Sequence, residues 1–318
     1  MINKKTIWLA GGCFWGMEKL MKSLSGVIDV MSGYANGHTD DPNYQEVCKG
    51  ESGYRETVRV TYDADRISLD AILFAYFAVI DPTLINRQGN DIGTQYQAGI
   101  YYTDDESKEI IDRITQVEKH RCATFHVEIA PLTKFYDAEE YHQNYLDKNP
   151  NGYCHIPLKE IAMLAKGTID PGHYKRPAHE VLKQRLTKEQ YDVTQNGSTE
   201  RPHQNAYWDS HKRGIYVDIA TSEPLFSSSK KFDSGCGWPS FSEPIDPNVI
   251  VYKQDTSHSM NRTEVRSRAG DSHLGHVFYG ENESPTEVRF CINSASLQFI
   301  PYDQMEAAGY GYLKDAAQ

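Results

Sequence analysis

The spacing of apolar residues changes near the middle of this chain and divides it into two parts. In the first part, short apolar runs typical of strands are separated by stretches in which apolar residues recur every three or four positions, as on one helix face. Their order predicts a β-α-β-β-α-β core, the arrangement of ferredoxin-like α+β folds. We expect strands at 6–10, 27–34, 57–62, 98–102 and 125–129, and helices between 13 and 25, at 69–80 and at 106–120.

The second part has the pattern of a mainly β domain. Short runs rich in β-branched and aromatic residues are bounded by turn residues, which favours antiparallel sheets over helices. One short helix is expected before these strands. The expected elements are a helix at 180–190 and strands at 214–220, 249–253, 263–268, 276–279 and 288–299.

A segment with several Gly and Pro residues separates the two parts, at 166–178. Such composition is typical of a linker. The chain has 318 residues, which is long for one hydrophobic core and suits two domains of ordinary size. We therefore predict one domain at 1–165, a linker at 166–178 and a second domain at 179–318.

Charge and composition narrow the classes of function. The formal net charge of −11 disfavours nucleic-acid binding, which needs a basic surface. Lys4 and Lys5 precede an apolar stretch, but no small-residue cleavage site follows. We therefore predict that this stretch is part of the folded first domain and not a signal peptide. No apolar run approaches the roughly 20 residues that cross a bilayer, so we expect no membrane association and a cytoplasmic location.

The six cysteines are too sparse for the disulfide framework of a small secreted domain, so reactive thiols are expected. Cys13 follows Gly11-Gly12, a turn that would place it in the first turn of a helix. Free backbone N–H groups and the helix dipole would stabilise its thiolate there. The alternative is that Cys13 is a small buried hydrophobic residue, the usual fate of a free cysteine.

Cys291 lies in a different setting. If 288–299 is one strand, then Arg289, Cys291 and Asn293 point to the same face, and the guanidinium would lower the pKa of the thiol. Two histidines and a further cysteine could form a zinc site with it, because two thiolates and two imidazoles are an accepted ligand set. From the residues alone, zinc binding and redox catalysis are equally favoured for Cys236, His273, His276 and Cys291.

The first domain resembles the A-type peptide methionine sulfoxide reductases. The resemblance rests on the runs at 11–16, 42–44, 53–56, 89–96 and 141–154. It implies that Cys13 is the nucleophile, that Glu56 donates the proton to the sulfoxide oxygen, and that Cys154 is the resolving thiol. The same resemblance implies hydrogen-bond donors at Tyr44 and Tyr96, a supporting acid at Asp91, and a methyl pocket formed by Phe14 and Trp15. Cys48 and Cys122 match no motif, and we expect them to be structural.

The second domain resembles the B-type reductases, through the runs around Cys236, His273 and Cys291 and those at 197–200 and 207–209. It implies a nucleophile at Cys291, a resolving thiol at Cys236, polar groups around the sulfoxide oxygen at His273, His276 and Asn293, a thiolate-side cation at Arg289 and a pocket wall at Trp238. Many B-type relatives hold a zinc ion with four cysteines. The matching positions here are Asp218, Thr221, Ser267 and Gly270, so we expect no zinc.

Together the two resemblances imply a bifunctional enzyme without a bound cofactor. Its substrates would be oxidised proteins and peptides, with the S epimer of methionine sulfoxide reduced in the first domain and the R epimer in the second, and with thioredoxin reopening both disulfides. A chiral sulfoxide justifies two sites, because a pocket built for one epimer misplaces the oxygen of the other. The alternatives are a thiol-based redox sensor or peroxidase and, less favoured, a zinc-binding module.

Overall fold

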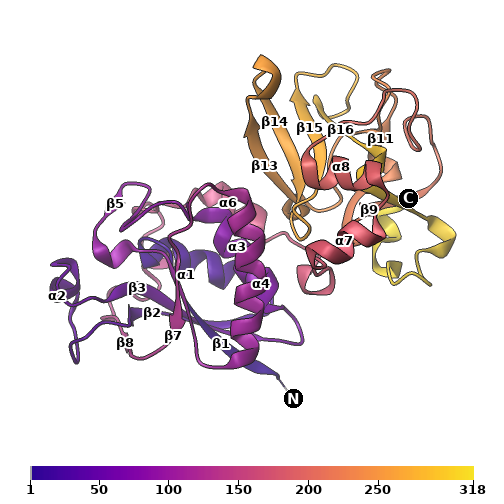
Figure 1. The fold of residues 1–318 in the computed structure, drawn as a ribbon. Helices are drawn as coiled ribbons and strands as arrows, with labels where there is room; N and C mark the ends of the chain where they lie inside the picture. Colours follow the sequence, from indigo (N-terminus) through magenta and orange to yellow (C-terminus); the bar gives the residue numbers. More distant parts are fainter. Residues whose placement is uncertain (1) are drawn as a thin grey trace. The chain divides into compact units, whose positions relative to one another are not determined.

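The computed structural model describes residues 2–318, apart from the side chain of His258, and the chain forms two compact units that divide between Lys166 and Gly167 (Figure 1). Each unit has its own hydrophobic core of buried side chains. The first unit is an α+β structure, and the second is built mainly from antiparallel sheets. The sequence predicted both of these classes.

The first unit contains a six-stranded sheet with the order β7-β6-β1-β3-β2-β8. Neighbouring strands are antiparallel except β6 and β7, which are parallel. The central four strands alternate with α1 and α3 in the order β-α-β-β-α-β. The strands of this unit are β1 (Lys4–Ala10), β2 (Val27–Ala35), β3 (Arg55–Asp63), β4 (Arg87–Gln88), β5 (Asp91–Ile92), β6 (Gly99–Tyr102), β7 (Glu128–Pro131) and β8 (Phe135–Asp137).

Helices pack on this sheet and bury its apolar side chains. Ser68 begins α3 by accepting a hydrogen bond from the backbone N–H of Ala71, and α3 lies beside α4 (Figure 1). The strand expected at 125–129 is β7, and it lies at 128–131. The helices are α1 (Phe14–Ser23), α2 (Tyr44–Cys48), α3 (Leu69–Val79), α4 (Asp105–Arg121), α5 (Tyr145–Lys148) and α6 (Leu158–Leu164).

The second unit has two sheets, one of three strands in the order β10-β9-β17 and one of six in the order β11-β12-β16-β15-β14-β13. All of their pairings are antiparallel. The strands are β9 (Gly214–Asp218), β10 (Pro224–Ser227), β11 (Lys231–Phe232), β12 (Ser240–Phe241), β13 (Ile250–Asp255), β14 (Arg262–Ser267), β15 (His273–Tyr279), β16 (Val288–Ile292) and β17 (Leu297–Pro301).

Two sequence predictions in the second unit are wrong. The expected helix at 180–190 is two helices, α7 (His179–Arg185) and α8 (Lys188–Asn196), because Thr187 and Gln190 form a capping box that starts a new helix. The expected strand at 288–299 is also two elements. β16 ends at Ile292, a turn at Ser294–Ser296 follows, and β17 continues in the other sheet.

Nearly all of the segment expected to be a linker, residues 167–178, belongs to the second unit. Asp246 accepts hydrogen bonds from the backbone N–H groups of Thr168 (2.5 Å) and Ile169 (3.0 Å). Ile169 and Tyr174 are buried in the core of the second unit. Gly and Pro residues indicate turns, and here the turns carry apolar side chains into a core.

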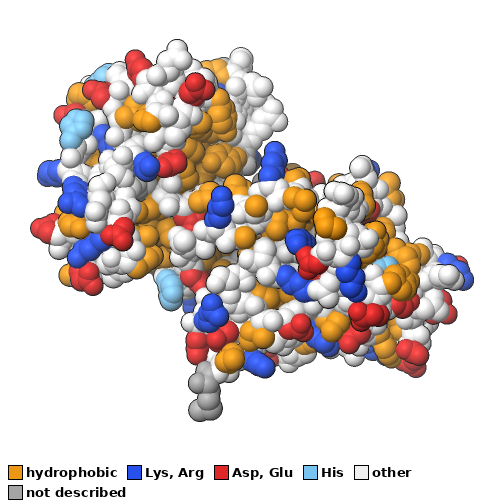
Figure 2. All heavy atoms as spheres, turned by 180° about the vertical axis from the view of Figure 1, so that it is seen from behind, with side chains coloured by type: hydrophobic (Ala, Val, Ile, Leu, Met, Phe, Trp, Pro, Cys, Tyr) orange, Lys and Arg blue, Asp and Glu red, His pale blue; other side chains and the backbone are white. Residues whose placement is uncertain are grey.

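Charged side chains of both signs are intermingled on the face shown in Figure 2. Although the net charge is −11, the acidic side chains on that face do not form a single negative patch. Among residues 2–318, no helix combines the length and the apolar character that crossing a bilayer requires.

Candidate active sites

Cys13 lies where β1 turns into α1. The turn needs glycine at position 12, because its φ is +81° and an added Cβ would lie 2.7 Å from Gln88 Cβ. Cys13 is the N-cap residue of α1, and its side chain is buried. The sequence therefore predicted its place at the helix start correctly.

The protonation of Cys13 differs from expectation. Burial raises the pKa of this thiol, and the negative charges of Glu56 and Asp91 raise it further. The hydrogen bond from the backbone N–H of Trp15 lowers the pKa, as a helix start should, but it is outweighed. Without substrate, Cys13 is therefore a neutral thiol and not a preformed thiolate.

Glu56 on β3 is almost fully buried beside Cys13. Its Oε2 accepts a hydrogen bond of 3.1 Å from the backbone N–H of Phe14. Its Oε1 has no hydrogen-bond partner among residues 2–318. Burial raises the pKa of Glu56 to about 8, with a further contribution from Asp91 and against the effect of Phe14. At neutral pH this carboxyl group holds a proton, and one of its oxygen atoms is free for a ligand.

Three further predicted site residues surround the same carboxyl group. Tyr44 is the first residue of α2, Tyr96 ends a short helix at Thr94–Tyr96, and Asp91 lies in β5. Burial and the nearby charge of Glu56 raise the pKa of both tyrosines, so both phenols are neutral donors. Tyr44 is positioned by Glu139, which accepts a hydrogen bond of 2.8 Å from its backbone N–H.

His142 was not predicted as a site residue, yet it lies among the aromatic side chains of the pocket. Its Nδ1 accepts a hydrogen bond of 3.2 Å from Trp15 Nε1, which orients the indole. Its ring centroid is 5.0 Å from that of Phe14 and 4.4 Å from that of Tyr44. Burial lowers the pKa of His142, so the ring is neutral. Its place in the run 141–154 was the only sequence signal.

Cys154 lies against the first turn of α1, beside Gly16. A Cβ built on Gly16 would be 3.1 Å from Cys154 Sγ, so the absence of a side chain at position 16 makes room for this sulfur. The Cys154 thiol donates a hydrogen bond of 3.0 Å to the backbone oxygen of Ile156. Because Gly16 is in the first turn of α1, which Cys13 caps, the two predicted redox partners border the same end of that helix.

Cys48 is exposed, and its thiol interacts with the hydroxyl group of Tyr44 four residues earlier on α2, so its structural role stays a prediction. Cys122 does fit a structural role, because its thiol donates to the backbone oxygen of Glu118 at the end of α4 (3.4 Å).

In the second unit, a polar row crosses four strands of the larger sheet. Cys291 on β16 pairs with Ser240 on β12 and with His276 on β15, and His276 pairs with Glu264 on β14. Directly paired residues project to the same face of a sheet. The sheet register therefore places the nucleophile expected from the sequence between a hydroxyl group and an imidazole.

The two expected redox thiols lie close together, with 3.7 Å between Cys236 Sγ and Cys291 Sγ. The hydrogen bond with Cys291 lowers the pKa of Cys236 despite its burial, and the hydroxyl groups of Ser234 (3.1 Å) and Ser240 (3.5 Å) lower it further. The same S–H···S contact and burial raise the pKa of Cys291. The pair thus holds one negative charge, favoured on Cys236.

Arg289 has the position that we expected. Its charge lowers the pKa of Cys291, but less than Cys236 and burial raise it. The guanidinium is anchored by Glu281, at 3.0 Å and 3.2 Å, and lies 4.6 Å from the ring centroid of Phe278. A nearby cation stabilises a thiolate of this pair.

The histidines reach the same side of the sheet through an irregularity in β15. Val265 pairs with Gly275 and Arg266 with His273, so one extra residue lies between these pairs. Three residues apart in a regular strand, His273 and His276 would point to opposite faces. Their ring centroids are instead 5.6 Å apart.

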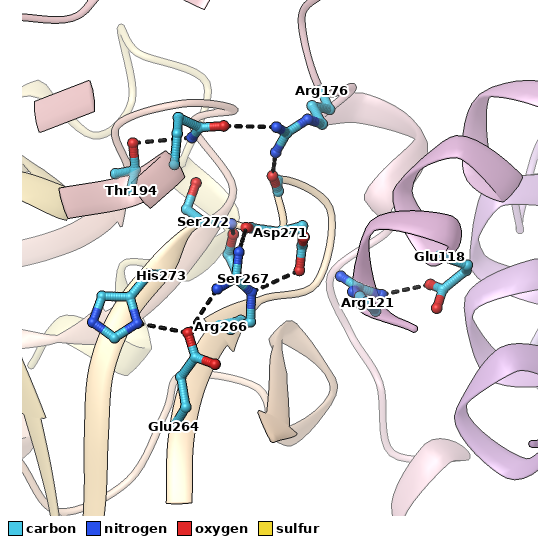
Figure 3. A network of polar contacts seen from close by, with 12 residues as sticks. Glu118, Arg121, Arg176, Thr194, Glu264, Arg266, Ser267, Asp271, Ser272 and His273 are labelled. Carbon is cyan, nitrogen blue, oxygen red and sulfur yellow. Dashed lines mark hydrogen bonds and ion pairs between the residues drawn. The ribbon is translucent and has the colours of Figure 1, made fainter. Parts of the chain in front are cut away.

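Carboxylates hold both rings. His273 Nδ1 lies 2.7 Å from Glu264, which also binds Arg266 (2.6 Å) in the network of Figure 3. His276 Nε2 lies 2.7 Å from Asp255. Burial raises the pKa of Glu264, but His273 and Arg266 outweigh it and lower the pKa to about 2. Each ring therefore donates one N–H to a carboxylate and keeps its other nitrogen for a ligand.

Asn293 and Trp238 are tied to a segment that the sequence singled out without a role. The amide of Asn293 donates to the backbone oxygen of Leu274 (3.0 Å) and accepts from the backbone N–H of Glu200 (3.1 Å). Trp238 Nε1 donates to the backbone oxygen of Glu200 (3.2 Å). Asn293 follows the end of β16, so the strand alternation that placed it beside Cys291 was wrong.

Comparison with known proteins assigns both units. A family model described as peptide methionine sulfoxide reductase matches residues 5–169, more than half of the chain. The chain belongs to the peptide methionine sulfoxide reductase family. The SelR domain model matches residues 186–301, so this reductase is a fusion of an A-type and a B-type unit, and it is an oxidoreductase.

Several solved structures are similar to part of this reductase. Mxr1 of Saccharomyces cerevisiae in reduced form is 38% identical, over 48% of this chain and 89% of that chain, with a TM-score of 0.46. Methionine sulfoxide reductase A of Corynebacterium diphtheriae is 33% identical over 56% and 82%, with a TM-score of 0.44. A structure of Mxr1 in complex with Trx2 is 26% identical over 45% and 85%, with a TM-score of 0.32.

The four positions that match a zinc site in other B-type reductases come together here around a carboxylate. Asp218 is fully buried and accepts hydrogen bonds from Ser267 (2.7 Å), Thr221 (3.2 Å) and Ser272 (3.0 Å). An added Cβ on Gly270 would lie in steric conflict with Asp218 Oδ2. The cluster has no thiolate or imidazole and its centre is filled by the carboxylate, so it does not fit zinc.

We expect Asp218→Ala to lower the free energy of unfolding of the second unit by about 2–5 kcal/mol, because several buried donors lose their acceptor. Urea denaturation followed by circular dichroism measures the change. Asp303→Ala, at an exposed position of the same unit, is the control and should change little. One zinc ion per chain by elemental analysis, together with destabilisation of the parent protein by a chelator, would contradict this role of Asp218.

Proposed function

We propose that the first unit reduces S-methionine sulfoxide and the second unit the R epimer, in proteins and peptides. The observation that carries this proposal is the protonated, buried Glu56 with a free oxygen atom beside the Cys13 thiol. An acid of that kind suits a substrate oxygen that must gain a proton. A thiol that only senses oxidants has no need of it.

In the first unit, Cys13 Sγ attacks the sulfoxide sulfur while Glu56 gives its proton to the sulfoxide oxygen. The proton of the Cys13 thiol passes to Glu56 and replaces the one that it donated, so Cys13 and Glu56 are both uncharged at the end of the step. The oxygen moves to Cys13 as a sulfenic acid, and methionine leaves as the thioether. Tyr44 and Tyr96 donate hydrogen bonds to the oxygen as its negative charge grows, and Asp91 helps to keep Glu56 protonated.

A disulfide then forms in the first unit. Cys154 attacks the sulfur of the Cys13 sulfenic acid, the S–O bond breaks, and the oxygen leaves as water. The pocket of Phe14 and Trp15, with His142 behind the indole, holds the substrate's methyl group. The aromatic walls of this pocket favour an apolar methyl group over a polar group.

In the second unit, Cys291 is the nucleophile and Cys236 the resolving thiol. The negative charge of the pair returns to Cys291 as it attacks the sulfoxide sulfur, assisted by Arg289. One of His273 and His276 carries a hydrogen on the ring nitrogen that faces the sulfoxide oxygen and gives this proton to it, so the oxygen ends on Cys291 as a sulfenic acid and methionine leaves as the thioether. Trp238 closes the methyl pocket. Asn293 acts through the backbone of Leu274 and Glu200 and so positions the turn after β16.

Both disulfides need an external dithiol, and thioredoxin supplies it by thiol–disulfide exchange. The dithiol attacks one sulfur of the bond, and its second thiol then releases the reduced enzyme. Reduction of each sulfoxide thus consumes two electrons from thioredoxin and yields one water molecule. The second unit does this without bound zinc.

Turnover tests this function against a redox sensor. With dithiothreitol and a peptide that carries both sulfoxide epimers, we expect the intact chain to convert all of the sulfoxide over many cycles. Liquid chromatography of the methionine peptide gives the yield per chain. A yield that stops at one or two equivalents, whatever the dithiothreitol concentration, would favour a sensor and contradict the proposal.

A further inference from the structure

His155 occupies a tight space between the turn that carries Cys13 and the first turns of α1. An added Cβ on Gly12 would lie 3.1 Å from its Nε2, and one on Gly16 would lie 3.1 Å from its Nδ1. The ring thus packs on two positions that lack side chains. His155 follows directly after the run at 141–154, and no role was predicted for it from the sequence.

The hydrogen bonds of His155 fix its tautomer. Nε2 lies 2.9 Å from the backbone oxygen of Gly11, which can only accept, so Nε2 carries the hydrogen. Burial lowers the pKa of His155, against opposing contributions from Asp91 and Gly11, so the ring is neutral at pH 7. In a neutral imidazole with Nε2–H, Nδ1 has a free lone pair.

This lone pair is buried and unused. Nδ1 has no hydrogen-bond partner among residues 2–318. Cys154 Sγ faces the same point beside α1, because a Cβ on Gly16 would be 3.1 Å from that sulfur and 3.1 Å from His155 Nδ1. A base and the resolving thiol therefore border one small space, next to the segment that carries Cys13.

The resolving thiol needs a base. Burial and the negative charge of Asp91 raise the pKa of Cys154, so it is protonated at neutral pH. Only a thiolate attacks a sulfenic acid at a useful rate. The thiol donates to Ile156 in the resting site, and a carbonyl oxygen cannot remove its proton.

We propose that His155 is the general base of disulfide formation in the first unit. This inference rests on the proposed function. His155 Nδ1 takes the proton of Cys154, and the resulting thiolate attacks Cys13 Sγ. The S–O bond of the sulfenic acid breaks, and its oxygen leaves with the proton of Glu56 as water. The imidazolium then returns its proton to the Glu56 carboxylate, directly or through solvent.

Two variants separate this role from a structural one. His155→Gln keeps a nitrogen donor for Gly11 but has no basic atom, whereas His155→Asn loses the Gly11 contact as well. The titratable groups around the ring are Asp91 on β5, whose charge acts on the imidazole, and Cys154, whose sulfur borders the same position beside α1. Both substitutions leave those groups in place.

The experiment mixes the full chain with one equivalent of an S-sulfoxide peptide and no reductant, then quenches at intervals between pH 6 and 9. Chromatography gives the methionine formed, and thiol counting gives the disulfide. We expect His155→Gln to slow disulfide formation about 100-fold relative to methionine formation at pH 7. Its disulfide rate should rise roughly tenfold per pH unit, because hydroxide replaces the base, while the parent rate changes little above pH 7.

Equal ratios of disulfide to methionine formation in His155→Gln and the parent chain would overturn the assignment. So would slowing in His155→Asn alone, since that would mean that the Gly11 contact is what matters. Methionine formation in each variant reports that its site is folded. If the parent chain itself forms no methionine, the proposed function fails and not the assignment of His155.

Discussion

Cys13→Ser is expected to remove reduction of S-methionine sulfoxide and to leave reduction of the R epimer intact, while Cys291→Ser does the reverse. A serine hydroxyl cannot replace either sulfur as nucleophile or oxygen acceptor. Loss of the nucleophile from a set of groups that act together costs about 10⁴-fold or more. The two cysteines belong to separate units, each with its own core and its own second thiol.

Single-turnover reduction of separate S and R sulfoxide peptides by both variants and the parent chain measures this partition. Dithiothreitol serves as the reductant, so that the result does not depend on thioredoxin binding. Cys122→Ser is a matched control, because that thiol lies at the end of α4 and belongs to no motif of either site. Loss of both activities in one variant, or of neither, would contradict independent sites.

Glu56→Gln should slow methionine formation from the S epimer by about 10²–10⁴-fold, since an amide cannot supply the proton. The pH profile gives a second readout. Burial raises the pKa of Glu56 to about 8, so its acid form is present below that pH and is lost above it. The rate in the parent chain should therefore fall about tenfold per pH unit above pH 8.

The variant should lack this decline, because glutamine does not titrate. The Cys13 thiol does not cancel the decline, since burial and Glu56 raise its pKa and keep it neutral over the same range. Quenched-flow measurement of methionine between pH 6 and 10 tests both statements. Glu106→Gln, on the surface at the start of α4, is the control. A decline that persists in Glu56→Gln would assign the titration to another group.

Local signals in the sequence were enough for most elements of the fold. Ser68 at the start of α3, the alternation along β3 and the turn residues between the later strands each act within a few residues. The break at Asn293 was missed because both halves of 288–299 are apolar, and only the pairing of β17 with β9 separates them. The ferredoxin-like assignment of the first unit stays a prediction, although the order of its main elements along the chain was predicted.

In the candidate sites, too, local motifs could be predicted from the sequence, whereas effects of distant segments could not. The cysteines, Glu56 and the tyrosines stand in recognisable motifs, so their roles could be predicted by resemblance. The protonation of Cys13 could not, because burial by distant segments decides it. His142 and His155 were missed for a related reason, since each is defined by what packs against it from α1.

The 3.7 Å separation of Cys236 Sγ and Cys291 Sγ has a consequence for recognition. A bond between these atoms requires them to approach by less than about 2 Å. Reduced and oxidised forms of the second unit should therefore have nearly the same shape. A reductant could not distinguish the two forms by the shape of their surfaces. Enzyme that is already reduced should therefore compete with oxidised enzyme for binding to the reductant.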